Sequence, residues 1–255
     1  EKALAANAAG LRQMFRAHAA RPDLVFSGVF QHRFDPAMRY LKRLVEQGAF
    51  GTILTADMHM RCLRTAEYYK ADTWRGTWAK EGGSLLINQA IHAVDLLAWM
   101  TGGVKTLSGT YSNLTHGDHI ETEDTAIAAL RYRNGALGTI SATSSSKLEW
   151  DMAYSFNGSG GTIDLRNGAI QRVDLKDKAL ADSIAEEVQM ISEEGKAGGS
   201  KKAYYGPSHS CQIADFVESI RTGKEPFITA ESARHTVDIV LGIYQSHREK
   251  KWVKI

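Results

Sequence analysis

Cysteine is scarce in this sequence. The 255 residues include only Cys62 and Cys211, which lie far apart and form neither a CxxC motif nor a cysteine–histidine ligand pair. This spacing argues against a zinc site and against a scaffold built on disulfides. Because unpaired cysteines are typical of a reducing compartment, we expect a cytoplasmic protein.

The sequence also lacks an excess of one charge and any long apolar run. Basic and acidic residues are interspersed, and the formal net charge is only +2, so we expect neither nucleic acid nor a membrane as a partner. No apolar run approaches the roughly 20 residues of a membrane span, and no signal peptide opens the chain. Residue 1 is Glu, which is consistent with a fragment that has lost its targeting signals. We expect a small molecule or a protein as the partner.

The start of the chain predicts a helix, a short strand and a second helix. Apolar residues recur with helical spacing over residues 3–20, until Arg21-Pro22 ends the pattern, and the apolar strand "LVFSGVF" follows. In "QHRFDPAMRYLKRLVEQGAFG", Asp35 can cap a helix that begins with Pro36 and ends at Gly48.

The middle of the chain has mainly strand character. "TILTADMHM" alternates between apolar and polar residues, and after an aromatic loop a helix is predicted from about Leu86 to Thr101. Strands are predicted at 105–115, 124–132, 136–146, 152–158, 161–165 and 169–174, joined by turns such as Arg166-Asn167-Gly168. This pattern predicts a mainly antiparallel sheet.

The C-terminal part predicts helices that cover the sheet. "KALADSIAEEVQMISEEGKAGGSKK" is partly helical at best, and its Gly-Gly-Ser-Lys-Lys end is expected to be mobile. Two amphipathic helices follow, with apolar stripes at Ile213, Phe216, Val217 and Ile220 and at Ala233, Val237, Val240, Leu241 and Tyr244. The predicted class is α+β, with an open sheet and helices packed on one face.

Asn88 and His92 carry the first candidate chemistry. On an α-helix, residues four apart share a face, so we expect the amide and the imidazole side by side in a cavity. Asp95 is close enough to orient the imidazole ring or to bond a neighbouring loop. The alternative is a buried histidine satisfied by backbone, with Asn88 as the helix N-cap.

Four other features allow both a functional and a structural interpretation. Arg33 in "QHRF" either binds a ligand or pairs with a surface carboxylate at a strand end, and His209 either reaches a cleft or caps its helix. Trp74 and Trp78, with Tyr68 and Tyr69, either wall a sugar or cofactor ring or belong to the core or to an oligomer contact. The spacing in "HGDHIETED" matches no tetrahedral metal site, so we predict no metal.

Several motifs together resemble the Gfo/Idh/MocA oxidoreductases, the family of glucose-fructose oxidoreductase and inositol dehydrogenase. They are "EK" at 1–2, "FQHRFDPAM", "GGSLLINQAIHAVDLLAWMTG", "EDTAIAALRYRNGALGTI", "GSGGTIDL" and the stretch from "HSCQIADFVESI" onward. The resemblance implies an NAD(P)-dependent enzyme with an N-terminal Rossmann domain and a C-terminal α/β domain. By this comparison, residues 1–30 are a remnant of the dinucleotide-binding domain, and residues 31–255 are the substrate-binding and oligomerisation domain. The open sheet often mediates dimers or tetramers in this family.

The family motifs also imply roles for single residues. Lys2 and His92 correspond to its catalytic lysine and histidine, while Glu1, Lys2 and Gln31 correspond to positions near the cofactor. The implied substrate-binding residues are Asn88, Arg33, His209 and Trp74. Many members have Asp where this sequence has Asn88; an amide cannot relay a proton, so Asn88 is expected to orient the substrate. Ala3 replaces the proline of the family's Glu-Lys-Pro motif.

One part of the family pattern is missing. No G-x-G-x-x-G lies between a first strand and a helix, so this chain alone should bind NAD or NADP poorly. The first hypothesis is an oxidoreductase of sugars, sugar nucleotides or cyclitols, represented here by its substrate domain. The second is a non-catalytic binding or scaffold protein that retains only the α/β domain. Lys2, Asn88 and His92 favour the first, and the missing glycine motif favours the second.

Overall fold

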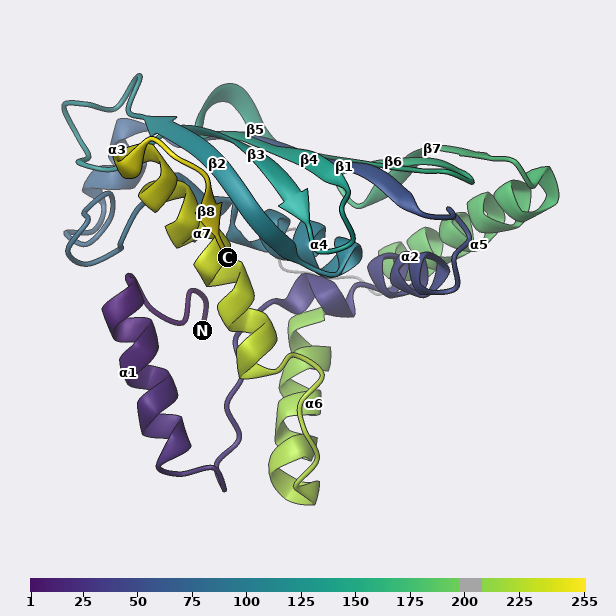
Figure 1. Cartoon of the computed structure of the whole chain (residues 1–255), viewed down its shortest axis with the longest axis horizontal. Helices are drawn as coiled ribbons and strands as arrows, with labels where there is room; N and C mark the ends of the chain where they lie inside the picture. Colours follow the sequence, from purple (N-terminus) through teal and green to yellow (C-terminus); the bar gives the residue numbers. More distant parts are fainter. Residues whose placement is uncertain (198–207) are drawn as a thin grey trace.

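The computed structural model describes residues 1–197 and 208–255, with only the backbone described for 192–197. The predicted mobile stretch at 198–202 lies outside these ranges. An open sheet forms one layer of the molecule, and the helices lie on one side of it (Figure 1). This arrangement confirms the predicted fold class.

The sheet is mixed, with one parallel pair among the strands that the structure describes. β1 runs parallel to β4, with Met58 opposite Ile140, and all other neighbours are antiparallel. The parallel pair is possible because a long segment with two α-helices, a π-helical turn and two strands separates β1 from β4. The strand order is β7-β6-β5-β1-β4-β3-β2-β8, with β1 (Ile53–Leu63), β2 (Val104–Ser112), β3 (Thr125–Tyr132), β4 (Leu137–Thr143), β5 (Ser145–Gly158), β6 (Gly161–Arg166), β7 (Ala169–Leu175) and β8 (Val253–Lys254).

Two helices begin later than predicted, at Ala8 and at Ile91, and a short helix at Ala66–Lys70 lies in the predicted aromatic loop. α1 begins after Asn7, whose side chain accepts a hydrogen bond from the Gly10 amide, and not at residue 3. The α-helices are α1 (Ala8–Ala19), α2 (Pro36–Glu46), α3 (Ala66–Lys70), α4 (Ile91–Thr101), α5 (Lys178–Ala197), α6 (Ser208–Thr222) and α7 (Ala230–Glu249).

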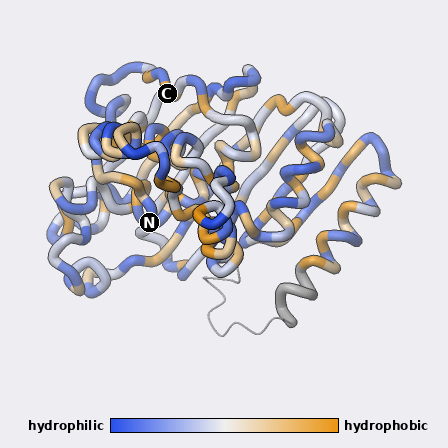
Figure 2. The backbone as a smooth tube through the Cα atoms, turned by 90° about the horizontal axis from the view of Figure 1, so that it is seen from below, coloured by the Kyte–Doolittle hydropathy of each residue, from blue (hydrophilic) through white to orange (hydrophobic). Residues whose placement is uncertain are grey.

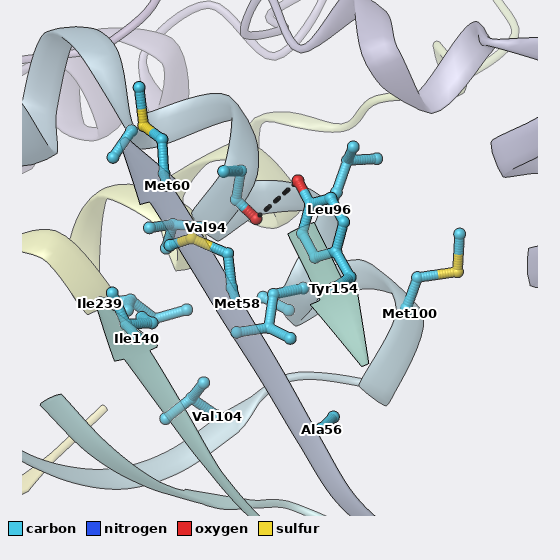
Figure 3. Packing of buried hydrophobic residues seen from close by; sticks show 14 of the residues in the cluster. Ala56, Met58, Met60, Val94, Leu96, Met100, Val104, Ile140, Tyr154 and Ile239 are labelled. Carbon is cyan, nitrogen blue, oxygen red and sulfur yellow. Dashed lines mark hydrogen bonds between the residues drawn. The ribbon is translucent and has the colours of Figure 1, made fainter. Parts of the chain in front are cut away.

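The core lies between the sheet and α4. Apolar residues occupy nearly every side of α4, so the helix is buried all round, as such a composition requires. Met58 and Met60 of β1 face α4 (Figure 3), and the Tyr154 hydroxyl donates to the Ala93 carbonyl oxygen at 3.4 Å. This packing fixes the start of α4 relative to β1 and β5.

Three predicted segments differ from the structure. Residues 24–30 form no strand; the Gly28 carbonyl accepts from the Gln212 side chain at 2.8 Å, and the Ser27 hydroxyl donates to Ile228 O at 2.7 Å. "QHRF" forms a 3-10 helix, η1 (Gln31–Phe34), and not a strand end. α5 is one continuous helix because Ala181, Ile184 and Val188 recur at helical spacing and are buried, and Figure 2 shows apolar and polar residues alternating along it.

The predicted inner stripe of α6 faces outward. Ile213, Val217 and Ile220 are 62%, 55% and 60% exposed, whereas the polar Gln212 and Ser219 are buried. The helix contacts η1 and projects away from the sheet (Figure 1), so its apolar residues do not reach the core. The expectation that this apolar stripe packs against the sheet is therefore wrong.

Candidate active site

A cavity of about 800 Å³ brings most of the predicted site residues together. We call it the central cavity. Six of the eight predicted residues line it, and Arg33 and Trp74 do not. Its walls come from the N-terminal segment, η1, the loops after β1 and β6, the start of α4, β5 and the start of α6. The lining residues are Glu1, Lys2, Val29, Gln31, His32, Asp35, Arg64, Tyr68, Arg75, Asn88, Gln89, His92, Trp150, Met152, Asn167, Gly168 and His209.

A widened helical turn carries Asn88 into this cavity. The predicted single helix is divided into a π-helical turn, η2 (Leu85–Gln89), and α4, and the Ala90 amide bonds the Leu85 carbonyl oxygen at 2.8 Å. Such turns are frequent at functional sites. Asn88 and His92 thus do not share one regular helix face, although both line the cavity, and Asn88 does not cap the helix.

The buried carboxylate of Glu123 anchors that turn. It accepts from the Leu86 amide at 2.9 Å, from the Ser84 amide at 3.3 Å and from the Tyr244 hydroxyl at 2.6 Å. Burial raises the pKa of Glu123 to about 7, although these hydrogen bonds oppose the shift. Sequence reasoning considered Glu123 only as a metal ligand and missed this role.

Lys2, Asn88 and Glu81 form a chain of hydrogen bonds. Lys2 Nζ donates to the Asn88 carbonyl oxygen at 2.7 Å and to Asn88 Oδ1 at 2.5 Å, while Asn88 Nδ2 donates to Glu81 Oε1 at 2.6 Å. Burial lowers the pKa of Lys2 to about 8, and the charge of Glu81 opposes that shift. The carboxylate of Glu81 thus lies behind the Asn88 amide, on the side away from Lys2 Nζ.

The His92 ring lies against Phe30 and His32, with ring centroids 5.8 and 5.4 Å away. Its Nδ1 is buried and has no hydrogen-bond partner among the residues described. Burial, followed by the charge of His32, lowers the pKa of His92 well below 6.5. The imidazole is therefore neutral at physiological pH, and His92 lines the cavity.

Of the two alternatives for Asp95, the structure shows the second, because its partner is in the neighbouring segment η1 and not His92. Asp95 accepts from Arg33 at 2.8 Å (Nε) and 2.5 Å (Nη2), and from the Thr236 hydroxyl at 2.7 Å. Arg33 also donates to Ser232. Both members of the ion pair are buried, so Arg33 joins η1 to α4 and α7 and is not exposed to a ligand in the central cavity.

His209 reaches the cavity through a contact between η1 and α6. Asp35, expected to cap α2, makes no capping bond with its side chain. It accepts instead from His32 Nδ1 at 2.8 Å and from the Ser208 hydroxyl. Because Ser208 is held in this way, its neighbour His209 lines the cavity.

The four aromatic residues separate into different environments. Tyr68 lines the central cavity, whereas Trp74 lines a neighbouring pocket together with Lys2 and Asn88. Tyr69 is buried, and Trp78 packs against Tyr111 and Tyr244 in the core. The structure thus favours the core interpretation for Tyr69 and Trp78.

Arg64 also lines the cavity and was missed by sequence reasoning. Its guanidinium donates to Gln89 Oε1 and stacks on Tyr68 and Trp150. An arginine directly after an alternating strand is the only signal that the sequence offers, and that signal is common on protein surfaces.

The described residues contain neither a cluster of metal ligands nor a membrane-spanning helix. No group of three or more His, Cys, Asp or Glu residues suited to a metal occurs in the described parts of the chain. None of the described helices is long and apolar enough to cross a membrane. Cys62 is buried, Cys211 is exposed, and both are free thiols.

Known proteins resemble this chain over its full length. Myo-inositol 2-dehydrogenase of Thermotoga maritima is 23% identical over 265 residues, which cover 100% of this chain and 71% of that enzyme. Scyllo-inositol 2-dehydrogenase (NAD(+)) of Bacillus subtilis is 23% identical over 84% of this chain and 57% of its own length. The crystal structure of the WlbA dehydrogenase from Bordetella pertussis, in complex with NADH and UDP-GlcNAcA, superposes with a TM-score of 0.87 at 26% identity. It covers 99% of this chain and 70% of that protein.

A family model gives the assignment. The model of the oxidoreductase family, C-terminal alpha/beta domain, matches residues 42–255, which is most of the chain. The distant relatives of this chain include an NAD-dependent inositol dehydrogenase, and the WlbA dehydrogenase structure holds NADH. The chain therefore belongs to the Gfo/Idh/MocA oxidoreductase family.

Proposed function

We propose that this chain is the substrate-binding part of an NAD(P)-dependent oxidoreductase that acts on a secondary alcohol of a sugar, sugar nucleotide or cyclitol. Residues 31–255 form the substrate-binding and oligomerisation domain, and residues 1–30 belong to the dinucleotide-binding domain. The observation that carries the proposal is that the Lys2 ammonium and the neutral His92 ring line one cavity together with Asn88.

Each of the three residues has a chemical task in alcohol oxidation. The hydroxyl O–H bond breaks as its proton passes to the neutral His92 ring, and the substrate C–H bond breaks as hydride leaves. The nicotinamide, when bound, accepts that hydride. Burial makes His92 a weak base, so the Lys2 cation is needed to stabilise negative charge on the oxygen while the carbonyl forms. Asn88 holds the Lys2 ammonium in place.

The nicotinamide end of the cofactor fits the residues near His92. Gln31 Oε1 is buried and has no hydrogen-bond partner among the residues described, so a carboxamide N–H would satisfy it. Glu1 and Lys2 line the same cavity. No G-x-G-x-x-G motif is present to hold the phosphates, so we assign that task to a part outside this chain.

We also propose a homo-oligomer, a dimer or a tetramer, formed through the sheet. The sheet face opposite the helices is uncovered (Figure 1) and exposes Leu63, Ile127 and Leu137, which are 38%, 54% and 50% exposed. These residues lie on β1, β3 and β4, which are adjacent strands. They are spread across this face, because Leu137 pairs with Thr55 and Leu63 lies eight residues further along β1. The support for the proposal is therefore the uncovered face itself, with its exposed apolar side chains.

A turnover assay separates the enzyme from the non-catalytic alternative. The polypeptide that the natural gene encodes is incubated with NAD+ or NADP+ and a panel of sugars, inositols and nucleotide sugars, and NAD(P)H absorbance is followed. The proposal predicts turnover of at least one member and its loss in Lys2→Ala. A scaffold protein would reduce neither cofactor with any member of the panel.

A further inference from the structure

Arg64 is a preorganised cation in the wall of the central cavity. Its Nε and Nη2 donate to Gln89 Oε1 at 3.0 and 2.6 Å, and its Nη1 donates to Leu63 O at 2.9 Å. A guanidinium has five N–H donors, so these contacts leave donors available. Because Arg64 lines the cavity, these donors can reach a ligand there.

The Arg64 guanidinium donates to the side-chain amide oxygen of Gln89 and not to a carboxylate. Among the described residues, no carboxylate oxygen forms an ion pair with it, whereas Arg33 pairs with Asp95 and Arg61 with Asp151. Arg75, which also lines the cavity, pairs with Asp72. A partly buried cation without a counter-ion is costly, and an anion in the cavity would remove that cost.

Aromatic rings fix the plane of the guanidinium. Arg64 Cζ lies 4.9 Å from the ring centroid of Tyr68 and 5.9 Å from that of Trp150. Gln89 is held in turn, because its Nε2 donates to the Tyr68 hydroxyl at 2.8 Å. The fork is therefore oriented before a ligand arrives, as bidentate recognition of a carboxylate or phosphate requires.

Two consecutive residues link this cation to the proposed reaction centre. Asn88 binds Lys2, and Gln89 binds Arg64. Arg64, Lys2 and His92 all line the central cavity, so an anion on Arg64 and the reacting alcohol would share that cavity. Both would be part of the same small molecule.

We propose that Arg64 binds an anionic group of the substrate, a carboxylate or a phosphate, and that this protein prefers acidic or phosphorylated sugars to neutral ones. This inference rests on the proposed function, because it concerns the substrate of the same cavity. It narrows the sugars, sugar nucleotides and cyclitols of the proposed function to those that carry an anionic group at this position.

The test is isothermal titration calorimetry of this chain with matched sugars. The neutral member is glucose, and the anionic members are glucuronate, glucose 6-phosphate and UDP-glucose. The expected result is a Kd at least about tenfold lower for one anionic member than for glucose, since a hydrogen bond to a charged group contributes about 1.5–3 kcal/mol. Glucuronate binding identifies a carboxylate, and binding of the other two identifies a phosphate.

Two variants and a control assign the preference to Arg64. In Arg64→Gln, the Kd values for anionic and neutral sugars should become equal. Arg64→Lys keeps the charge but not the planar guanidinium, so part of the difference in Kd should remain. Arg172→Gln removes a cation whose side chain is 62% exposed and which pairs with Asp164 at the sheet edge, so the ratio should be unchanged. Circular dichroism checks folding, and the Lys variant serves if the Gln variant fails to fold.

Several outcomes would overturn the inference. They are equal affinity for neutral and anionic sugars, binding of none of the anionic members at millimolar concentration, and a preference that survives Arg64→Gln. Failure of the proposed function is separate, because anionic sugars would then bind without reduction of NAD+ or NADP+ in the natural polypeptide. If neutral sugars are turned over with a kcat/KM as high as that of the anionic sugars, the anion site is contradicted. The proposed dehydrogenase activity is not contradicted by that result.

Discussion

The ammonium of Lys2 donates hydrogen bonds to both oxygens of Asn88, at 2.7 Å to the main chain and 2.5 Å to the side chain. The Asn88 amide nitrogen is used by Glu81, so the amide can adopt only one orientation. A neutral residue thus positions the cation, and the negative charge lies one residue further away.

The pKa of Lys2 should depend on Glu81. Lys2 has a pKa of about 8, and the carboxylate of Glu81 raises it against the effect of burial. In Glu81→Gln, loss of the negative charge should therefore lower the pKa of Lys2 below about 8, and the cation would be lost at lower pH. NMR titration of the Lys2 side-chain carbon next to Nζ measures this directly. An unchanged or increased pKa would show that Glu81 does not act on Lys2.

The Arg33–Asp95 pair should matter for stability. Asp95→Asn leaves a buried guanidinium without its counter-ion, so we expect the free energy of unfolding to fall by about 3–5 kcal/mol. Lys178→Gln is the control, because its pair with Asp174 is exposed and should contribute little to stability. Urea denaturation compares the two variants. Similar small losses in both would mean that the buried pair is not a major link between η1 and α4.

Glu123 should make stability depend on pH. Its pKa is 4.5 in the unfolded reference and about 7 when folded, so the folded state binds more protons between these values. Stability contributed by protonated Glu123 is complete below pH 4.5 and is lost as the pH rises through about 7, a fall on the order of 3 kcal/mol.

The matched variant for this effect is Glu123→Gln, which carries no titrating group. The decrease in the free energy of unfolding between pH 5 and pH 7.5 should be smaller in the variant than in the wild type. Urea midpoints at the two pH values provide the comparison. The same decrease in both proteins would assign the pH dependence to other groups.

Cofactor affinity should be low in this chain alone. The strands that the structure describes include no parallel strand–helix–strand unit with a glycine-rich turn, so the phosphates of NADH lack a binding site here. Fluorescence titration with NADH should show very weak binding. Micromolar affinity would contradict the assignment of the phosphate site to a part outside this chain.

Local patterns in the sequence predicted much of the fold and only part of the site. The alternating strands and the turn at Asn167-Gly168, where both φ angles are positive, follow from local chemistry. The Arg33–Asp95 contact spans 62 positions and the Arg64–Gln89 contact spans 25, so no local spacing reveals them. The outward stripe of α6 shows the same limit, because helical periodicity identifies an apolar face but not what covers it.

The most direct test of the catalytic proposal is the kcat of His92→Ala in the polypeptide that the natural gene encodes. A buried, neutral imidazole that accepts the hydroxyl proton predicts a decrease of about 10²-fold or more, with the circular dichroism spectrum unchanged. A folded variant that retains the kcat of the wild type would contradict the role of His92 as the base.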